Sequence, residues 1–346
     1  MRRRHGLFNV SYEQEIAIIR TRFEWTVFLA FLLLMAILPK LLSLGWLDFF
    51  IRWGITIVAV MGLNLITGYC GQISLGHAAF MGMGGFTGAI LLNLGLPFVV
   101  VLPLAGLAAG ISGLVFGMPA LRVKGLYLAF TTLAAHHIIM TVLVRLMGGI
   151  TGHEVRPPVI FGLVIDSEVR VYYFLFVIVA LCTFVAKNIA RGKAGRAFVA
   201  VRDHDIAANT LGINVYYYKL LVFFIGCCFA GVGGLIHVVY FGWASVEAFT
   251  LWNAIWYLGM LIVGGMGTIS GVFFGTFFIL GIEQVGFSLA PRVGEAIPAI
   301  AGTILGALPV IVFSLILMLF IVFEPKGLSH RWEIIKESFR LFPFNY

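Results

Sequence analysis

The sequence predicts an all-α protein, a polytopic bundle of transmembrane helices, and three observations support that prediction. Of the 346 residues, 61% are hydrophobic and only 11% are charged, whereas soluble domains average about 25% charged residues. No Asp, Glu, Lys or Arg occurs from Trp53 to Leu121, a run of 69 residues, and about 20 apolar residues already cross the hydrocarbon core. A backbone in lipid must satisfy its own hydrogen bonds, so each crossing is expected to be helical. This composition excludes an ordinary soluble enzyme, a disordered chain and a nucleic-acid-binding protein.

Hydropathy predicts about ten membrane spans along the chain. They are expected at residues 25–43, 53–69, 74–94, 97–118, 125–145, 171–187, 218–242, 253–267, 269–289 and 299–323. The last third leaves an alternative open, in which 253–289 forms one broken hairpin with a glycine-rich centre. Around the expected transmembrane domain of 25–323, we expect a cytoplasmic amphipathic segment over 1–24 and a cytoplasmic tail over 324–346.

The basic residues orient this bundle. In a ten-span arrangement that begins inside, the cytoplasmic pieces are 1–24, 119–124, 187–219 and 324–346, and they hold 17 of the 23 Lys and Arg residues. Basic residues collect on the cytoplasmic side of membranes, so both termini and the polar loop 188–217 are predicted to be cytoplasmic. We therefore attribute the net charge of +8 to the basic residues that set the orientation of the chain in the membrane. The four cysteines lie in apolar stretches without a CxxC pair, so neither a disulfide nor a metal site is expected.

A glycine-rich block over 62–79 places uncharged polar side chains at membrane level. Glycines permit a broken helix whose freed backbone groups face a cavity, and a polar group in lipid needs a partner or water. One interpretation is a substrate path lined by Asn64, Gln72, Ser74 and His77, with Gly71 and Gly76 as hinges. The alternative is close helix packing with interhelical hydrogen bonds. For the following glycines at positions 82, 84, 85 and 88, we favour close packing.

The polar loop contains a segment, 195–214, that is typical of a short helix with a glycine stop. Acidic residues stabilise a helix start, and glycine is the preferred residue just after a helix end. Such a helix between two spans either docks in a groove on a partner protein or lies as a connector on lipid headgroups. The residues assigned to docking are Arg196, Arg202, Asp203, Asp205, Ala207, Ala208, Leu211 and Gly212, where Asp203 and Asp205 form the helix start and Ala207, Ala208 and Leu211 the apolar face.

Two features later in the sequence are also candidates for a functional role. Residues 264–271 contain Gly264, Gly265 and Gly267, and such a run breaks a helix readily. We interpret it as a turn between two spans, with a hinge or inner gate as the alternative. Glu283 is the one acidic residue expected inside a span, where it is either functional or snorkels to water.

Three blocks of the sequence, at 62–79, 125–133 and 264–271, resemble in this order the permease subunits of ABC importers for branched-chain amino acids, specifically the M-type (LivM-like) subunit. The block 62–79 looks like the family's Gly-Gln-x-Ser-Leu-Gly-His-Ala signature. Residues 125–133 are similar to its fifth-helix pattern, which adds Thr131 and Thr132 to the expected substrate path. Residues 264–271 resemble its late glycine turn.

The docking segment resembles a further motif of ABC importers. Ala207-Ala208 followed by Gly212 is similar to the EAA-type motif, which forms the coupling helix seated on the ATPase. This chain departs from the motif at its glutamate, where Ile206 stands with Asp205 beside it.

The resemblance covers about residues 50–327 and implies a membrane-spanning permease subunit in the inner (cytoplasmic) membrane. It implies import of branched-chain or related amino acids, which a soluble substrate-binding protein delivers. The implied partners are a second permease subunit of the H type and two ATPase subunits. ATP and Mg are expected on the ATPases, because this chain has no Walker loop, and no cofactor, metal or catalytic residue is expected here.

Other functions remain open at this point. Similar permeases carry urea or short amides. An ion-coupled secondary amino-acid transporter usually needs buried acids, which the second to fifth expected spans lack. A channel would form a pore without an ATPase partner. An intramembrane enzyme would need an acid–base or metal constellation that the sequence does not show.

Overall fold

The computed structural model describes residues 22–120, 125–146, 152–160, 163–165, 167–296 and 301–341. Most of the predicted segment 1–24, and parts of the predicted loops 119–124 and 147–170, lie outside these residues. The described chain is all-α apart from four strands of two residues each. In chain order the helices are α2 (Arg22–Leu41), α3 (Leu44–Leu63), the π-helix η1 (Asn64–Tyr69), α4 (His77–Asn93), α5 (Phe98–Ala120), α6 (Leu126–Leu146), α7 (Glu168–Arg191), α8 (Lys193–Asp203), α9 (Asp205–Thr210), α10 (Val215–Phe241), the 3-10 helix η2 (Val246–Phe249), α11 (Leu251–Gly264), α12 (Ile269–Ala296), α13 (Ala301–Phe323) and α14 (Gly327–Leu341).

Each of the ten predicted segments overlaps one of these helices, which confirms the all-α fold. In the described part of the chain, seven helices are long and apolar enough to cross a membrane, or eight if the bent pair of α13 and α14 counts as one span. The predicted segments at α2 and α4 are not among them; α4 has only 17 residues. Residues 253–289 form two helices joined by a turn, α11 and α12, which pack against each other.

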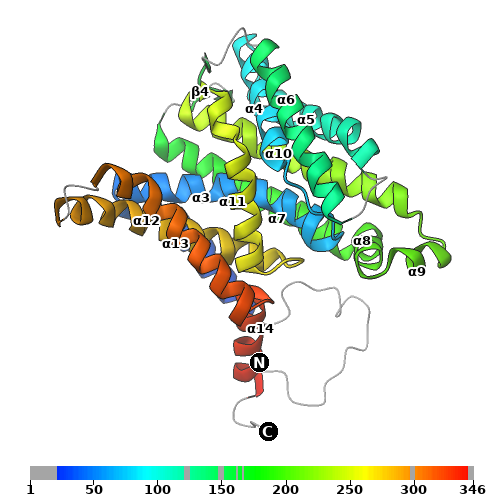
Figure 1. The fold of residues 1–346 in the computed structure, drawn as a ribbon. Coiled ribbons are helices and arrows are strands. Elements are labelled where there is room, and N and C mark those ends of the chain that lie inside the picture. Colours follow the sequence, from blue (N-terminus) through cyan, green and yellow to red (C-terminus); the bar gives the residue numbers. More distant parts are fainter. Residues whose placement is uncertain are drawn as a thin grey trace.

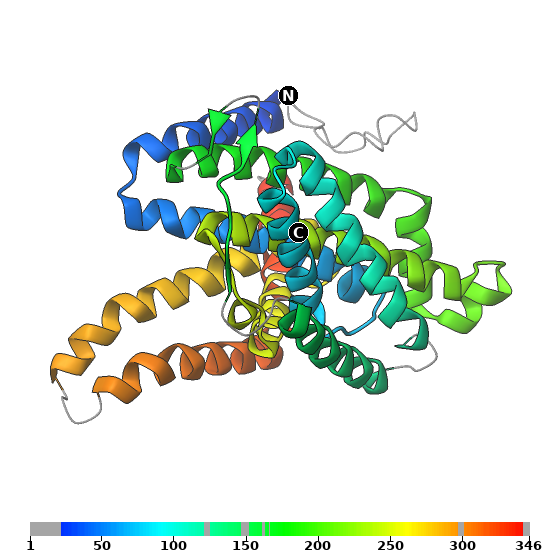
Figure 2. The same ribbon diagram turned by 90° about the horizontal axis from the view of Figure 1, so that it is seen from above.

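The centre of the molecule is α10, which packs against α3, α4 and α5. Figures 1 and 2 show α12 and α13 extending together to one side of this centre, while α8 and α9 lie at another. The short strands tie loops together. Strand β1 (His153–Glu154) pairs antiparallel with β4 (Trp243–Ala244), and β2 (Val159–Ile160) pairs with β3 (Leu163–Val164).

Glycines bring α4 and α10 into backbone contact. A Cβ atom added to Gly84 would overlap the backbone of Gly231, and one added to Gly234 would overlap the carbonyl oxygen of Met81. Small residues at helix interfaces permit this approach in membranes. The packing interpretation of the glycines in α4 is therefore confirmed.

We expect Gly234→Ala to destabilise the folded chain by about 1–3 kcal/mol, because the new methyl group overpacks an interface that cannot expand locally. Thermal unfolding of the detergent-solubilised chain measures the change. Gly281→Ala in α12 is the matched control, because a Cβ there meets no atom within 4 Å, and helix propensity favours Ala over Gly by about 1 kcal/mol. Equal unfolding temperatures for the two variants would contradict the interpretation.

Candidate functional site

The first part of the site is a break between α3 and α4. The helix widens into the π-helix η1, and residues 70–76 continue without helical structure. Gly71 adopts a φ of 71°, which glycine reaches at little steric cost. The hydroxyl of Thr67 donates to the carbonyl of Gln72 (3.0 Å), and the amide of Leu75 donates to Thr132 Oγ1 on α6 (3.0 Å). The predicted helix interruption is therefore present and is held against α6.

The side chains expected along a substrate path lie deep in this break. Gln72, Ser74 and His77 are buried, and His77 Nε2 lies 2.8 Å from the carbonyl oxygen of Ala59. Three polar atoms of this segment, Gln72 Oε1, Ser74 Oγ and His77 Nδ1, have no hydrogen-bond partner among the described residues. Unpaired buried polar groups are costly, and one of these side chains, Gln72, also lines a cavity.

The two threonines of α6 lie differently. Thr132 is buried, and its hydroxyl donates a hydrogen bond to the carbonyl of Ala129 and accepts one from the backbone amide of Leu75 in the break. Thr131 is half-buried, and its hydroxyl donates to Leu128 O (2.8 Å). A Cβ on Gly76 would meet the carbonyl oxygen of Thr132. Gly76 therefore permits close contact between the break and α6.

Asn64 turns away from the break and binds the glycine turn between α11 and α12. Its Oδ1 accepts from the amide of Gly267 (2.9 Å), and its Nδ2 donates to the carbonyl of Thr268 (3.0 Å). Gly265 and Gly267 have φ angles of 109° and 78°, so the chain does turn between α11 and α12 at the predicted place. The Thr268 hydroxyl also lies 2.9 Å from the Ser329 hydroxyl at the start of α14.

The docking segment forms an elbow of two helices, α8 and α9, rather than the single helix predicted. The chain breaks at His204, whose backbone is extended (φ −160°, ψ 97°). Asp203 therefore ends α8, and its prediction as part of a helix start is wrong. Asp205 does begin α9, and its carboxylate lies 3.8 Å from Lys219 Nζ. His204 is the N-cap residue of α9, because its Nδ1 accepts a hydrogen bond from the backbone amide of Ala207 (3.2 Å).

The end of α9 has the geometry predicted for Gly212. Its φ is 84°, and its amide donates to Asn209 O (3.0 Å) while the amide of Ile213 donates to Ala208 O (3.0 Å). This pair of bonds is the Schellman motif, which places glycine at C′.

The two alanines of α9 differ in their exposure. Ala208 is only 2% exposed and packs against the body of the protein, whereas Ala207 is exposed. Ile206 and Leu211 are 65% and 80% exposed. The apolar face available to a partner therefore consists of Ile206, Ala207 and Leu211, and it lacks the predicted Ala208. Arg196 lies exposed on α8, where its Nη1 donates to the carbonyl of Arg191 (3.2 Å).

Arg202 connects this elbow to the helix break. Its Nη1 donates to the carbonyl oxygen of Gly68 in η1 (2.9 Å), and its Nε and Nη2 each lie 3.0 Å from Asp203 Oδ1. A Cβ on Gly71 or on Gly267 would meet the Arg202 side chain. We call Asn64, Gly68, Arg202, Gly267 and Thr268 the polar junction, because together they join η1, the elbow and the glycine turn. Sequence reasoning placed Arg202 in the docking segment but missed this contact.

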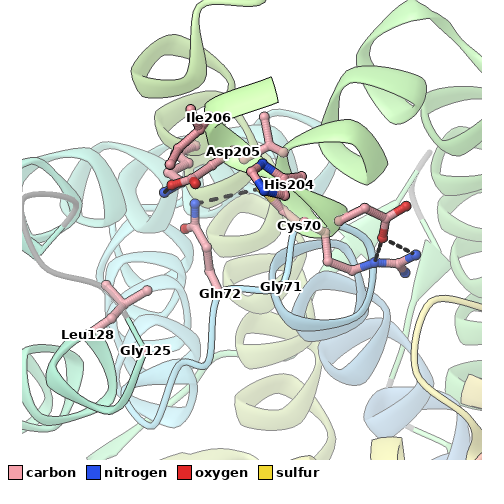
Figure 3. A pocket seen from close by; sticks show the side chains of 12 residues that line it. Cys70, Gly71, Gln72, Gly125, Leu128, His204, Asp205 and Ile206 are labelled. Atoms are coloured by element: carbon pink, nitrogen blue, oxygen red, sulfur yellow. Dashed lines mark hydrogen bonds and ion pairs between the residues drawn. The ribbon is translucent and has the colours of Figure 1, made fainter. Parts of the chain in front are cut away.

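A cavity of about 320 Å³ lies beside the junction, between α6, the break and the elbow. Figure 3 shows Gln72 between Leu128 of α6 and the residues His204–Ile206 of the elbow. Cys70 lines the same cavity and accepts a hydrogen bond from Gln72 Nε2 (3.7 Å). Among the described residues, no cluster of three His, Cys, Asp or Glu side chains could hold a metal ion.

Cys70 can report on this cavity. Burial raises the pKa of its thiol to about 12, so at pH 7.5 the reactive thiolate fraction is roughly 10⁻⁴ or less. In a chain whose other cysteines are replaced by alanine, we expect N-ethylmaleimide to modify Cys70 very slowly, and faster as the pH rises toward 10. Mass spectrometry of timed samples measures the rate. Labelling as fast as that of a free thiol at pH 7.5 would contradict the buried position.

These features define a class of protein: a multi-pass membrane protein with an interrupted helix pair and, between two long helices, an elbow that exposes a small apolar face. The family described as "Branched-chain amino acid transport system / permease component" matches residues 45–322. The chain belongs to this family, and its several apolar helices fit a multi-pass protein of the inner membrane.

The similar curated proteins carry related descriptions. The chain is 32% identical to the "High-affinity branched-chain amino acid transport system permease protein LivM" of Escherichia coli, over 76% of this chain and 69% of that protein. It is also 32% identical to the protein of the same description in Salmonella typhimurium, over 70% of this chain and 64% of that protein. A "Probable branched-chain amino acid transport permease protein LivM" of Methanocaldococcus jannaschii is 24% identical over 51% of this chain and 52% of that protein. No solved structure matches the chain.

Proposed function

We propose that the chain is the M-type permease subunit of an ATP-driven importer of branched-chain amino acids. The match over residues 45–322 to permease components of branched-chain amino-acid transport systems carries this proposal. The partners are a second permease subunit of the H type, two ATPase subunits that bind ATP and Mg, and a soluble binding protein that delivers substrate. This chain supplies the membrane path and hydrolyses nothing itself.

In this proposal the elbow transmits the movement of the ATPases. The ATPase groove binds Ile206, Ala207 and Leu211, which are exposed together on α9 and its end. Movement of the elbow then pulls on η1 through the bond from Arg202 to Gly68 O, and on the glycine turn through Asn64. A coupling element must be joined to the parts that it moves, and the polar junction makes that connection.

The topology proposed for this function has about ten spans with both termini cytoplasmic. The elbow, the loop 188–217 and the tail from 324 then lie on the ATPase side, together with the segment 1–24. The substrate passes the break near Gln72, Ser74 and His77, whose unpaired buried atoms would transiently bind the ammonium and carboxylate groups of the amino acid. Gly71, Gly264, Gly265 and Gly267 are the hinge positions of this path.

Uptake into vesicles tests the proposal. The chain is reconstituted with the H-type subunit and the two ATPases of the same transport system, with binding protein and L-leucine outside and ATP inside. We expect leucine accumulation that requires ATP, the binding protein and this chain together. Accumulation driven by an ion gradient without ATP would overturn the proposal, and uptake of urea in place of leucine would reassign the substrate.

A further inference from the structure

A second cavity, of about 390 Å³, lies between α3, α10, α11 and α12, away from the polar junction. Its volume falls in the range of small-molecule sites, which is about 300–1,000 Å³. Polar and charged side chains from four different helices line it, together with a larger number of apolar and aromatic ones. A set of charged groups that converge on an otherwise apolar cavity is typical of a binding site.

The positive group of this cavity is Arg52 on α3. Its Nη2 pairs with Asp48 Oδ2 (2.8 Å) and donates to Gln284 Oε1 (3.0 Å). Its Nε is buried and has no hydrogen-bond partner among the described residues. An unpaired N–H of a guanidinium is a strong donor for a carboxylate, and burial makes leaving it unpaired costly. Arg52 therefore keeps one unpaired donor on a side chain that lines the cavity.

The negative group is Glu283 on α12, which lines the same cavity. Arg52 and the indole of Trp256 line the cavity with it, and both are close enough to favour its charged form. Nearby, Asn253 uses its amide nitrogen to donate to Ala248 O (2.7 Å), which leaves its amide oxygen as an acceptor. Carboxylate and amide oxygens together form a suitable environment for an ammonium group.

Between these groups the walls are apolar. Ile55, Met260, Leu280 and Val310 line the cavity. Trp256 stacks on Phe313 with ring centroids 3.9 Å apart, which holds that wall in place. An aliphatic side chain of three or four carbons would bury its surface here at about 25 cal/mol per Å².

We propose that this cavity binds the zwitterion of an aliphatic L-amino acid, with Arg52 on its carboxylate, Glu283 on its ammonium group and the apolar wall on its side chain. The inference rests on the proposed function, which names this class of molecule as the substrate. The cavity would be a second binding site on the substrate path, in addition to the helix break. Arg52 precedes Asn64 by 12 residues of helix, so the site lies about 18 Å along α3 from the polar junction.

Binding of radiolabelled L-leucine to the purified full chain in detergent tests the site without any ATPase. We expect saturable binding that Arg52→Gln and Glu283→Gln each weaken at least about tenfold, as expected for loss of a charge-assisted hydrogen bond. Leu280→Trp should abolish binding by filling the cavity while both charges remain. Arg145→Gln is the matched control, because Arg145 is exposed at the end of α6 and lies outside the cavity.

Two leucine analogues separate binding from a merely structural role. 4-Methylpentanoate lacks the ammonium group and 3-methylbutylamine lacks the carboxylate. Competition by the amine should be unaffected by Arg52→Gln, and competition by the acid should be unaffected by Glu283→Gln. Equal loss for both analogues, unchanged leucine binding in all three cavity variants, or no saturable binding up to about 10 mM by the wild-type chain would each overturn the site. ATP-driven leucine uptake that persists in those cases would leave the proposed function standing.

Discussion

Leu211→Asp is expected to reduce ATP-driven leucine uptake at least about a hundredfold and to prevent co-purification of the ATPase subunits. Leu211 is 80% exposed beside Ile206, and a buried leucine side chain contributes about 1.5–3 kcal/mol to an interface. Aspartate removes this contribution and adds the cost of burying an unpaired charge. Pull-down of the ATPases and vesicle uptake measure the two effects.

Ala208→Asp is the informative companion of Leu211→Asp. Ala208 is buried against the body of the protein, so a charge there should lower the yield of folded chain, whereas Leu211→Asp should leave yield and unfolding temperature unchanged. If Leu211→Asp co-purified normally with the ATPases and transported leucine at the wild-type rate, α9 would not be the docking element.

Arg202→Ala is expected to reduce leucine uptake by about thirtyfold while the ATPases still bind and hydrolyse ATP. The substitution removes the 2.9 Å bond to Gly68 O and the contact with Asp203, but it leaves the exposed apolar face of α9 unchanged. Hydrogen bonds from charged donors are worth about 1.5–3 kcal/mol, and their loss disconnects the elbow from the helix break. The measurement is the ratio of leucine imported to ATP hydrolysed.

Lys193→Ala is the matched control for Arg202→Ala, because Lys193 is exposed at the start of the same helix. It should leave that ratio unchanged. An unchanged ratio of leucine imported to ATP hydrolysed in Arg202→Ala would show that the Arg202–Gly68 bond does not couple the elbow to the helix break.

The sequence was a good guide to the helices because their signal is local. A run of apolar residues predicts a helix at a given place whatever it packs against, and the helices α2 to α13 that overlap predicted spans illustrate this. The turn at 264–271 and the glycine stop at 212 were also predictable, since both need backbone angles that glycine reaches readily. The π-helix η1 was not, because its six residues have no composition that distinguishes them from an α-helical turn.

The site was predicted as a set of segments but not as a set of contacts. Ala207 and Ala208 are the same residue type, and only the packing of the elbow decides that one is exposed and the other buried. Asn64 was expected on the substrate path, yet its partner is Thr268, 204 positions away. The break at His204 lacks a glycine or proline signal as well. Which side of a helix is buried, and which distant residue a side chain contacts, depend on tertiary contacts that a single sequence does not reveal.

In the proposed coupling, the wide turn of η1 would permit a particular mode of motion. A π-helical turn holds one residue more than an α-helical turn, and passing that surplus residue along a helix rotates each side chain it passes by about 100°. A pull on Gly68 can therefore be relieved by a screw motion of α3 instead of by tilting. Such a screw would reach the opposite end of the same helix, where Arg52 lies, and would swing the guanidinium away from its ligand as the inner end is drawn down.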